Sequence, residues 1–304
     1  MIRPAYLTAG DTIGLVSPSS AVDTSVLDNA VKVLESRGFR VLVGRYAAGR
    51  HNAFSGSDAE RVSDLHSMLD NPAVKAIMCS RGGYGAIRLL PLFDVNRIVK
   101  QPRWLIGFSD ATALHSILLK KAKIECIHGT MPLKFAPAGT PDPDLDSLLA
   151  VLGGTMPRFE IAAGKDTRCG TAEGELTGGN LSVLYSLLAT PFFPDMRNKI
   201  LFIEDIGEYI YHVDRMLMSF YLAGVFSSIK GLIAGSFSDM KDSESNPYGH
   251  SVYEIISEYA DRANIPFVCN FPAGHTHTNK AFVLGRKIHM RSSKSLATIE
   301  FSVK

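Results

Sequence analysis

The sequence of 304 residues lacks a strong excess of either charge, because 32 lysines and arginines stand against 30 aspartates and glutamates. A surface that tracks nucleic-acid phosphates is normally strongly basic. The chain also lacks an apolar run near the ~20 residues that span a bilayer. Thr8, Asp11 and Thr12 interrupt the segment where a secretion signal needs an apolar stretch. We therefore expect a cytoplasmic protein with neither a nucleic-acid nor a membrane partner.

Cysteine is scarce, and its spacing excludes two common kinds of site. Cys79, Cys126, Cys169 and Cys269 are far apart and form no C-x-x-C pair. Zinc ribbons and redox dithiols need closely spaced pairs, and a disulfide framework is not expected in a large chain without a secretion signal. We predict that the four are buried small side chains in a reducing compartment.

The first half of the chain alternates short apolar runs with amphipathic segments. Apolar runs over Thr12–Ser17, Ala76–Cys79 and Trp104–Phe108 predict strands, and the S-x-x-E capping box of Ser57 and Glu60 predicts the start of a helix. Alternating strands and helices with nearly continuous apolar strands indicate a parallel sheet covered on both faces. Ligands of such sheets bind at the carboxyl ends of the strands.

Length and composition predict two domains. The segment FAPAGTPDPDLD after residue 134 is rich in proline and is typical of a linker, which we expect to end in a short helix through Leu148 and Leu152. We predict an N-terminal α/β domain over 1–135, a linker region over 136–169, and a β-rich domain with a few helices over 170–304. Phe282–Leu284 is expected to be a strand of that second domain.

The strongest local signal for chemistry is IGFSDAT, which contains Ser109. A serine on a tight turn between a buried strand and a helix presents its hydroxyl above the sheet, beside backbone N–H groups that can bind an oxyanion. The motif departs from G-x-S-x-G because Ala111 replaces the second glycine. The alternative is that Ser109 or Asp110 is only the N-cap of the helix.

A second signal is CSRGGYG, which follows the predicted strand that ends at Cys79. Glycines let a backbone approach a ligand closely and turn its N–H groups toward an anion. No G-K-[ST] follows, so the segment is not a P-loop. A structural turn and an anion site are both open interpretations.

A nucleophilic serine needs a base, and the histidines are the candidates. His115 is too far from Ser109 along one helix, at about 9 Å for 1.5 Å per residue. His128 stands at a predicted strand end but is typical of a structural histidine. The loop PAGHTHTN holds His275 and His277, and loops often carry catalytic histidines, so one of this pair is the candidate base.

A carboxylate is needed to orient the base, and FIED places Glu204 and Asp205 at the end of an apolar strand. Such carboxylates are also common as turn or cap residues. The H-x-H pair could instead bind a metal together with one of these carboxylates. No third histidine and no H-E-x-x-H helix accompanies the pair, so the metallohydrolase remains an alternative only.

Together these segments resemble the LD-carboxypeptidase family, the S66 serine peptidases, which include murein tetrapeptide carboxypeptidases and microcin-immunity peptidases. The resemblance spans nearly the whole chain and rests on seven ordered blocks. The blocks are GDTIGLVSPSS, SDAERVSDLHSML, SRGGYGAIRLL, IGFSDATALH, GELTGGNLSVLYSLLATP, LFIEDIGEYIYHVDRMLMSF and FPAGHTHTN.

The resemblance implies a Ser-Glu-His triad of Ser109, Glu204 and His275, with Asn279 at the family's usual position. It favours His275 over His277. It also implies an N-terminal α/β domain with a parallel sheet, similar to class I amidotransferases and flavodoxins, and a β-rich C-terminal swivelling domain. The nucleophile lies on the first domain and the other two residues on the second. The stretch KAFVLG after Asn279 departs from the family pattern.

The family also implies an oxyanion hole formed by the backbone N–H groups of Gly83 and Asp110. Arg81 and Asn180 match blocks near the cleft and are expected to contact substrate. The implied activity is a serine carboxypeptidase that releases terminal D-alanine from murein tetrapeptides in peptidoglycan recycling. No cofactor or metal is implied, and relatives suggest a homodimer.

Two other functions stay open at this point. A microcin-immunity type peptidase would share the triad and cleave an aminoacyl-adenylate-like conjugate. Trp104 lies in a predicted buried strand and is a poor stacking platform for a base, whereas Tyr84, Tyr209 and Tyr211 could serve. A non-catalytic binding module could keep the fold without the chemistry.

Overall fold

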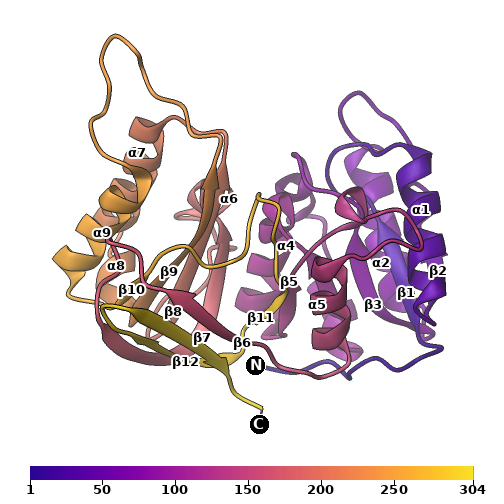
Figure 1. The fold of residues 1–304 in the computed structure, drawn as a ribbon. Helices are drawn as coiled ribbons and strands as arrows, with labels where there is room; N and C mark the ends of the chain where they lie inside the picture. Colours follow the sequence, from indigo (N-terminus) through magenta and orange to yellow (C-terminus); the bar gives the residue numbers. More distant parts are fainter. Residues whose placement is uncertain (304) are drawn as a thin grey trace. The chain divides into compact units, whose positions relative to one another are not determined.

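The computed structural model describes residues 1–303 and divides the chain into two compact units. The N-terminal unit contains Met1–Thr155 together with Lys280–Leu284. The C-terminal unit contains Met156–Asn279 and the chain from Gly285 on. Figure 1 draws the first unit from indigo to magenta, with one short yellow strand, and the second from dark pink through orange to yellow.

The N-terminal unit is an α/β fold built on one six-stranded sheet. Its strands are β1 (Thr12–Val16), β2 (Arg40–Val43), β3 (Val74–Cys79), β4 (Trp104–Gly107), β5 (Cys126–His128) and β11 (Phe282–Leu284). Its α-helices are α1 (Thr24–Ser36), α2 (Asp58–Asp70), α3 (Val95–Lys100), α4 (Thr112–Ile117) and α5 (Pro143–Leu152). Short helical turns lie at Ala86–Leu89 (η1), Ser109–Ala111 (η2), Leu118–Ala122 (η3) and Pro132–Lys134 (η4).

The order of the strands is β11-β5-β4-β3-β1-β2, and all neighbouring pairs are parallel except β11 with β5. The central strands β3 and β4 are almost wholly buried, as expected for parallel strands covered on both faces. Ser57 and Glu60 form the predicted capping box at the start of α2. The predicted parallel sheet is therefore confirmed, and the turns that follow β1, β3 and β4 start from its carboxyl edge.

The C-terminal unit is built on a seven-stranded mixed sheet. Its strands are β6 (Arg158–Ala162), β7 (Gly170–Asn180), β8 (Ile200–Ile206), β9 (Gly231–Ser238), β10 (Phe267–Val268), β12 (Lys287–Ser292) and β13 (Leu296–Phe301). Its helices are α6 (Leu181–Leu187), α7 (Ile210–Leu222), α8 (Val225–Ser228) and α9 (Val252–Ala263).

The strand order is β10-β9-β8-β7-β12-β13-β6. The pairs from β10 to β7 are parallel, and the pairs from β7 to β6 are antiparallel. Apolar side chains of α7, α8 and α9 pack on one face of β8 and β9, and Figure 1 shows α7 and α9 together there. On the other face the Phe271 ring packs against Phe159 of β6 and Phe202 of β8, at centroid distances of 4.6 and 5.7 Å. The predicted β-rich domain with a few helices is confirmed.

The division of the chain differs from the predicted boundaries. Residues 136–169 were expected to be a linker region with a short helix through Leu148 and Leu152. They contain that helix, α5, and also the strand β6, and the two elements belong to different units. Asp142 caps α5 by accepting the Leu145 N–H at 3.0 Å, and Pro143 occupies the first turn, where proline is tolerated. Only residues 143–146 of the proline-rich stretch belong to α5, the expected short helix, and the units separate after Thr155.

The strand Phe282–Leu284, predicted for the C-terminal domain, lies in the other unit. Figure 1 shows β11 in yellow beside the magenta β5, with which it pairs in antiparallel register. The Phe282 ring stacks on His128 at a centroid distance of 4.7 Å. The segment that departs from the family pattern therefore completes the edge of the N-terminal sheet.

Three of the four cysteines are buried. Cys79, Cys126 and Cys269 are buried as predicted, but Cys169 is exposed, so the prediction was wrong for that residue. No helix within residues 1–303 is both long enough and apolar enough to cross a membrane.

Candidate active site

Ser109 lies on a strained turn directly after β4. Its φ of +60° is in the left-handed region, which non-glycine residues adopt at a cost of about 1–2 kcal/mol. Its side chain is half-buried, and within the N-terminal unit its hydroxyl has no hydrogen-bond partner. The turn therefore presents a hydroxyl at the carboxyl edge of the sheet, as the strand-turn-helix pattern predicts.

The alternative that Ser109 or Asp110 is only a helix cap is wrong. Neither the short helical turn η2 nor α4 has a side-chain cap, and the Asp110 carboxylate instead accepts the Ala86 N–H at 2.8 Å. Asp110 is buried, and burial raises the pKa of its carboxyl group above the usual value. This side chain ties the serine turn to the start of η1, which follows the glycine-rich segment.

The glycine-rich segment after β3 lies against Ser109. A β-carbon at Gly82 would come within 2.8 Å of both Cβ and Oγ of Ser109, so only glycine fits there. Gly83, the next residue, is exposed, and the Tyr84 N–H after it donates to Ser20 Oγ at 3.2 Å. The predicted turn and the predicted nucleophile are thus neighbours in space.

Arg81 begins this segment and is half-buried. Its Nη1 donates to the carbonyl oxygen of Ala21 at 2.9 Å, which holds the guanidinium group near the turn after β1. The interaction uses one of the five N–H donors of the side chain. Arg81 therefore lies in the same region of the unit as Ser20 and Gly83.

Glu204 and His275 form a hydrogen-bonded pair in the C-terminal unit. His275 Nδ1 lies 2.7 Å from Glu204 Oε2, and the Glu204 side chain is 0% exposed while that of His275 is 14% exposed. An ionised carboxylate only accepts hydrogen bonds, so Nδ1 carries the hydrogen, and in the neutral imidazole Nε2 then keeps its lone pair. This is the tautomer that a general base needs.

The loop that carries His275 is held in place at several points. Gly274 has a φ of +121°, and a β-carbon there would come within 2.4 Å of Ser236 Oγ and 2.9 Å of Glu204 Oε2. The Asn279 side chain accepts the Gly274 N–H at 2.9 Å, and Ser238 Oγ donates to the His275 carbonyl oxygen at 2.8 Å. These contacts fix the imidazole against the buried carboxylate.

Asp205 and Asn180 fasten the end of β8 to the start of α6. The Asp205 carboxylate accepts the Asn180 side-chain amide, the Ser182 N–H and the Ile206 N–H at 2.8–2.9 Å. Burial, together with the adjacent Glu204 charge, raises the pKa of Asp205 to about 7. Asn180 also caps α6 by accepting the Val183 N–H, so both side chains order the backbone beside Glu204.

The other candidate histidines lie in different surroundings. His277 is exposed and His115 is fully buried, where burial lowers its pKa to about 4. His128 is buried against the Phe282 ring. Residues 1–303 contain no group of three histidine, cysteine, aspartate or glutamate side chains that could hold a metal ion. The H-x-H pair therefore lacks a third ligand in the described part of the chain.

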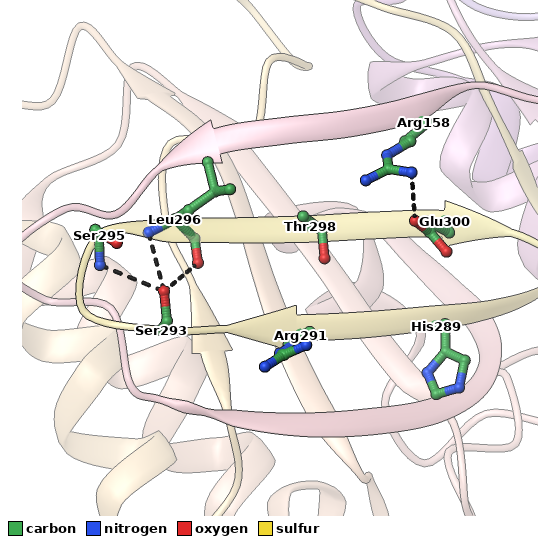
Figure 2. A pocket seen from close by; sticks show the side chains of 8 residues that line it. All are labelled: Arg158, His289, Arg291, Ser293, Ser295, Leu296, Thr298 and Glu300. Atoms are coloured by element: carbon green, nitrogen blue, oxygen red, sulfur yellow. Dashed lines mark hydrogen bonds and ion pairs between the residues drawn. The ribbon is translucent and has the colours of Figure 1, made fainter.

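A hollow of about 530 Å³ lies elsewhere, on the antiparallel half of the C-terminal sheet. Figure 2 shows Arg158 and Glu300 joined by an ion pair across neighbouring strands, with His289 and Arg291 on the next strand. It is lined by charged and uncharged residues of β6, β12 and β13 and of the turn that joins β12 to β13. None of the predicted site residues lines it.

Two residues that support the candidate site escaped the sequence analysis. Ser20 bonds the turn beside Gly83, and Ser238 bonds the loop of His275. Ser20 follows the end of β1 and Ser238 ends β9. Because carboxyl ends of parallel strands meet at one edge, the polar residues at both positions were a usable signal.

The arrangement within each unit has a definite chemical capacity. One unit presents a half-buried serine hydroxyl beside the glycine-rich turn, and the other presents an imidazole whose Nδ1 is bonded to a buried carboxylate. A base of this kind can take a proton from a hydroxyl and stabilise the charge that it gains.

Comparison with known proteins agrees with this reading of both units. Residues 13–129 match the LD-carboxypeptidase N-terminal domain, and residues 173–290 match the LD-carboxypeptidase C-terminal domain. The probable murein peptide carboxypeptidase of Bacillus subtilis is 32% identical, with 99% of this chain and 95% of that protein covered. The murein tetrapeptide carboxypeptidase of Pseudomonas aeruginosa is 31% identical, with 90% and 91% covered.

Solved structures of related proteins share the fold. The muramoyltetrapeptide carboxypeptidase of Oxalobacter formigenes is 31% identical, covers 96% of this chain and 98% of its own, and has a TM-score of 0.86. The microcin C7 self-immunity protein MccF in complex with aspartyl sulfamoyl adenosine is 25% identical, covers 99% and 98%, and has a TM-score of 0.88. The chain therefore belongs to the LD-carboxypeptidase family of peptidases.

Proposed function

We propose that this protein is a serine carboxypeptidase that removes the terminal D-alanine from murein tetrapeptides with a triad of Ser109, His275 and Glu204. The observation that carries the proposal is the 2.7 Å hydrogen bond between His275 Nδ1 and the fully buried Glu204. It prepares Nε2 as a base, and the strained turn of Ser109 supplies a hydroxyl that needs one.

In this mechanism Ser109 Oγ attacks the carbonyl carbon between the L-centre of the diamino acid and D-alanine, and His275 Nε2 takes its proton. The protonated imidazole is stabilised by Glu204 and then gives the proton to the nitrogen of the leaving D-alanine. The C–N bond breaks, and an acyl ester remains on Ser109. A water molecule, deprotonated by the same imidazole, hydrolyses that ester and restores the serine.

The backbone N–H groups of Gly83 and Asp110 would donate to the oxyanion. Such donors, fixed in advance, are typically worth about 10²–10³-fold in rate each. Arg81 is the proposed cation for the carboxylate of the released D-alanine, since an exopeptidase must bind a terminal carboxylate. Asn180 stays a predicted substrate contact in addition to its role at the cap of α6.

Related proteins support the murein substrate over the microcin type. Relatives named as murein peptide carboxypeptidases are 31–32% identical, against 28% for the microcin C7 self-immunity protein of Escherichia coli. Trp104 is fully buried and donates its indole N–H to the Ala5 carbonyl oxygen at 2.9 Å, so it offers no stacking platform. Cytoplasmic localisation stays a prediction of the sequence composition, and the homodimer stays a prediction of the family resemblance.

Incubation of the protein with free murein tetrapeptide should yield tripeptide and D-alanine, measured by mass spectrometry as the loss of one alanine. EDTA should leave the rate unchanged, because the proposed chemistry needs only side chains and backbone N–H groups. The control is the same peptide ending in L-alanine, which should stay intact.

Two outcomes would contradict this proposal. An intact tetrapeptide beside a cleaved aminoacyl sulfamoyl adenosine would assign the microcin-type function instead. Inhibition by EDTA that zinc reverses would assign the chemistry to a metal held by the H-x-H segment.

Replacing Gly82 by alanine should lower kcat/KM by about 10²-fold or more, because the new methyl group would overlap Ser109 Cβ and Oγ and displace the nucleophile. The melting temperature should fall only slightly, because the overlap is confined to one turn at the carboxyl edge of the sheet. Rates with murein tetrapeptide and thermal unfolding by circular dichroism measure both.

The matched control is Gly153→Ala at the end of α5. Gly153 has a φ of −79°, and a β-carbon there would approach backbone oxygens only to 3.3–3.5 Å. Its activity should equal that of the wild type. Full activity of Gly82→Ala would show that Ser109 does not need its observed position.

A further inference from the structure

Four exposed side chains form a row at the start of α7 in the C-terminal unit. The rings of Tyr209 and Tyr211 lie 5.4 Å apart, centroid to centroid. Lys241 Nζ lies over the Tyr209 ring at 5.9 Å, and the Arg215 guanidinium lies over the Tyr211 ring at 5.2 Å. We call these four residues the tyrosine row. The order along the row is the Lys241 ammonium group, the two tyrosine rings and the Arg215 guanidinium group.

The tyrosine row lies at the same end of the sheet as the Glu204–His275 pair. Ser238, at the end of β9, donates its Oγ to the His275 carbonyl oxygen and accepts the Gly207 N–H at 2.9 Å. Three residues on, Lys241 pairs with Tyr209 as an isolated bridge. The loop of the candidate base and the tyrosine row are therefore both linked to the carboxyl end of β9.

Both cations of the row lack a carboxylate partner within residues 1–303, and both side chains are exposed. The acidic side chains that are nearest to them in sequence are hydrogen-bonded to other groups. Glu208 bonds His212 Nδ1 at 2.6 Å, Asp214 accepts the Tyr259 hydroxyl at 2.6 Å, and Asp242 accepts the Ser243 and Tyr248 N–H groups. The charges of Lys241 and Arg215, which lie over the tyrosine rings, are therefore available to a ligand.

Exposure of the two rings also indicates a binding surface. Tyr209 is 45% and Tyr211 is 49% exposed, and neither hydroxyl has a hydrogen-bond partner in the described chain. Exposed tyrosines flanked by arginine are enriched where proteins bind ligands and partners. The other end of α7 differs, because there Arg262 over Tyr221 is bonded to Glu258.

We propose that the tyrosine row binds the acidic part of the substrate on the amino side of the scissile bond, a proposal that rests on the proposed function. Murein tetrapeptide contains a γ-linked D-glutamate whose α-carboxylate is free. Arg215 and Lys241 would bind such carboxylates, and the tyrosine hydroxyls would donate to peptide carbonyl groups. Arg81, in the other unit, is the proposed partner of the terminal carboxylate that leaves with D-alanine.

The test measures binding without turnover, in the inactive Ser109→Ala background, by isothermal titration calorimetry. The probes are L-alanyl-γ-D-glutamyl-meso-diaminopimelyl-D-alanine and the same peptide with the glutamate α-carboxylate amidated. Arg215→Gln with Lys241→Gln should weaken binding of the acidic peptide about tenfold, as expected for two exposed charge pairs. Binding of the amidated peptide should change about twofold or less, because part of the charge contact is already missing.

The matched control is Arg262→Gln, which removes the cation over Tyr221 at the far end of the same helix and should leave both affinities unchanged. An equal loss for the two peptides, or no loss for either, would overturn the proposal. So would a change in sedimentation mass with unchanged peptide affinity, since the row would then be a contact between copies of the chain.

The two proposals fail separately in this experiment. If the wild-type protein releases D-alanine while the paired variant binds both peptides normally, only the tyrosine row is wrong. If the wild-type protein cleaves neither peptide, the proposed function is wrong as well.

Discussion

Ser109→Ala should lower kcat for murein tetrapeptide by about 10⁶-fold, the loss typical for removal of a serine nucleophile. The free energy of unfolding should change by about 1 kcal/mol or less, because the half-buried hydroxyl has no partner within its unit. Peptide binding should persist, since alanine keeps the backbone turn. Stopped assays by mass spectrometry and chemical denaturation measure the two quantities.

Two further variants test whether the loss of activity is specific to the Ser109 hydroxyl. Ser116→Ala, in the following helix α4, removes a hydroxyl that bonds only the Thr112 carbonyl oxygen, and it should keep full activity. Ser109→Gly should be as inactive as Ser109→Ala but more stable than it, because glycine adopts the φ of +60° without strain. Substantial turnover by either Ser109 variant would mean that another group attacks the carbonyl carbon.

Glu204→Gln should lower kcat by about 10⁴-fold, comparable to amidation of the triad carboxylate in other serine peptidases. Glutamine has the same shape but no charge, so it cannot stabilise a protonated His275. Its amide nitrogen can also donate to Nδ1, which would move the ring hydrogen to Nε2 and block the base. Steady-state kinetics with murein tetrapeptide measure the effect.

The control for this charge change is Glu175→Gln on the neighbouring strand β7. Glu175 bonds Lys199 at 2.7 Å near the surface, so its loss should change activity about twofold or less. If Glu204→Gln were as active as the control, the buried hydrogen bond to His275 would have only a structural role.

Local features of the N-terminal unit were predictable because their causes lie within a few residues. The capping box of Ser57 and Glu60 forms as its spacing requires. The turn at Ser109 follows from an apolar strand that runs directly into a serine and an aspartate. Periodicity and burial agree in these segments, so neighbouring residues suffice to predict the element.

Other parts depend on contacts that sequence spacing does not reveal. The proline-rich composition before α5 is typical of a linker, but α5 belongs to the N-terminal unit, which ends only after Thr155. A three-residue apolar strand such as Phe282–Leu284 suits the edge of either sheet. Its partner is decided by the pairing with β5 and by the stacking of Phe282 on His128.

The candidate base and its carboxylate show the same limit. Spacing alone did not distinguish His275 from His277, or Glu204 from Asp205, and only the family resemblance favoured one of each. The structure separates them physically, since His277 is exposed and the Asp205 carboxylate is bonded to Asn180 and to backbone N–H groups. Burial of Glu204 and the brace of Asn279 are long-range effects of the folded loop.

The return of the chain to the first sheet has a consequence for biosynthesis. Strand β5 ends at His128, but its outer neighbour β11 is made only after residue 282. At the usual ribosomal speed this interval lasts about 10–30 seconds. During that time the unpaired side of β5 would be open to association with other nascent chains. We therefore expect the first unit to mature late in translation, and a gene truncated after codon 155 to give an aggregating product.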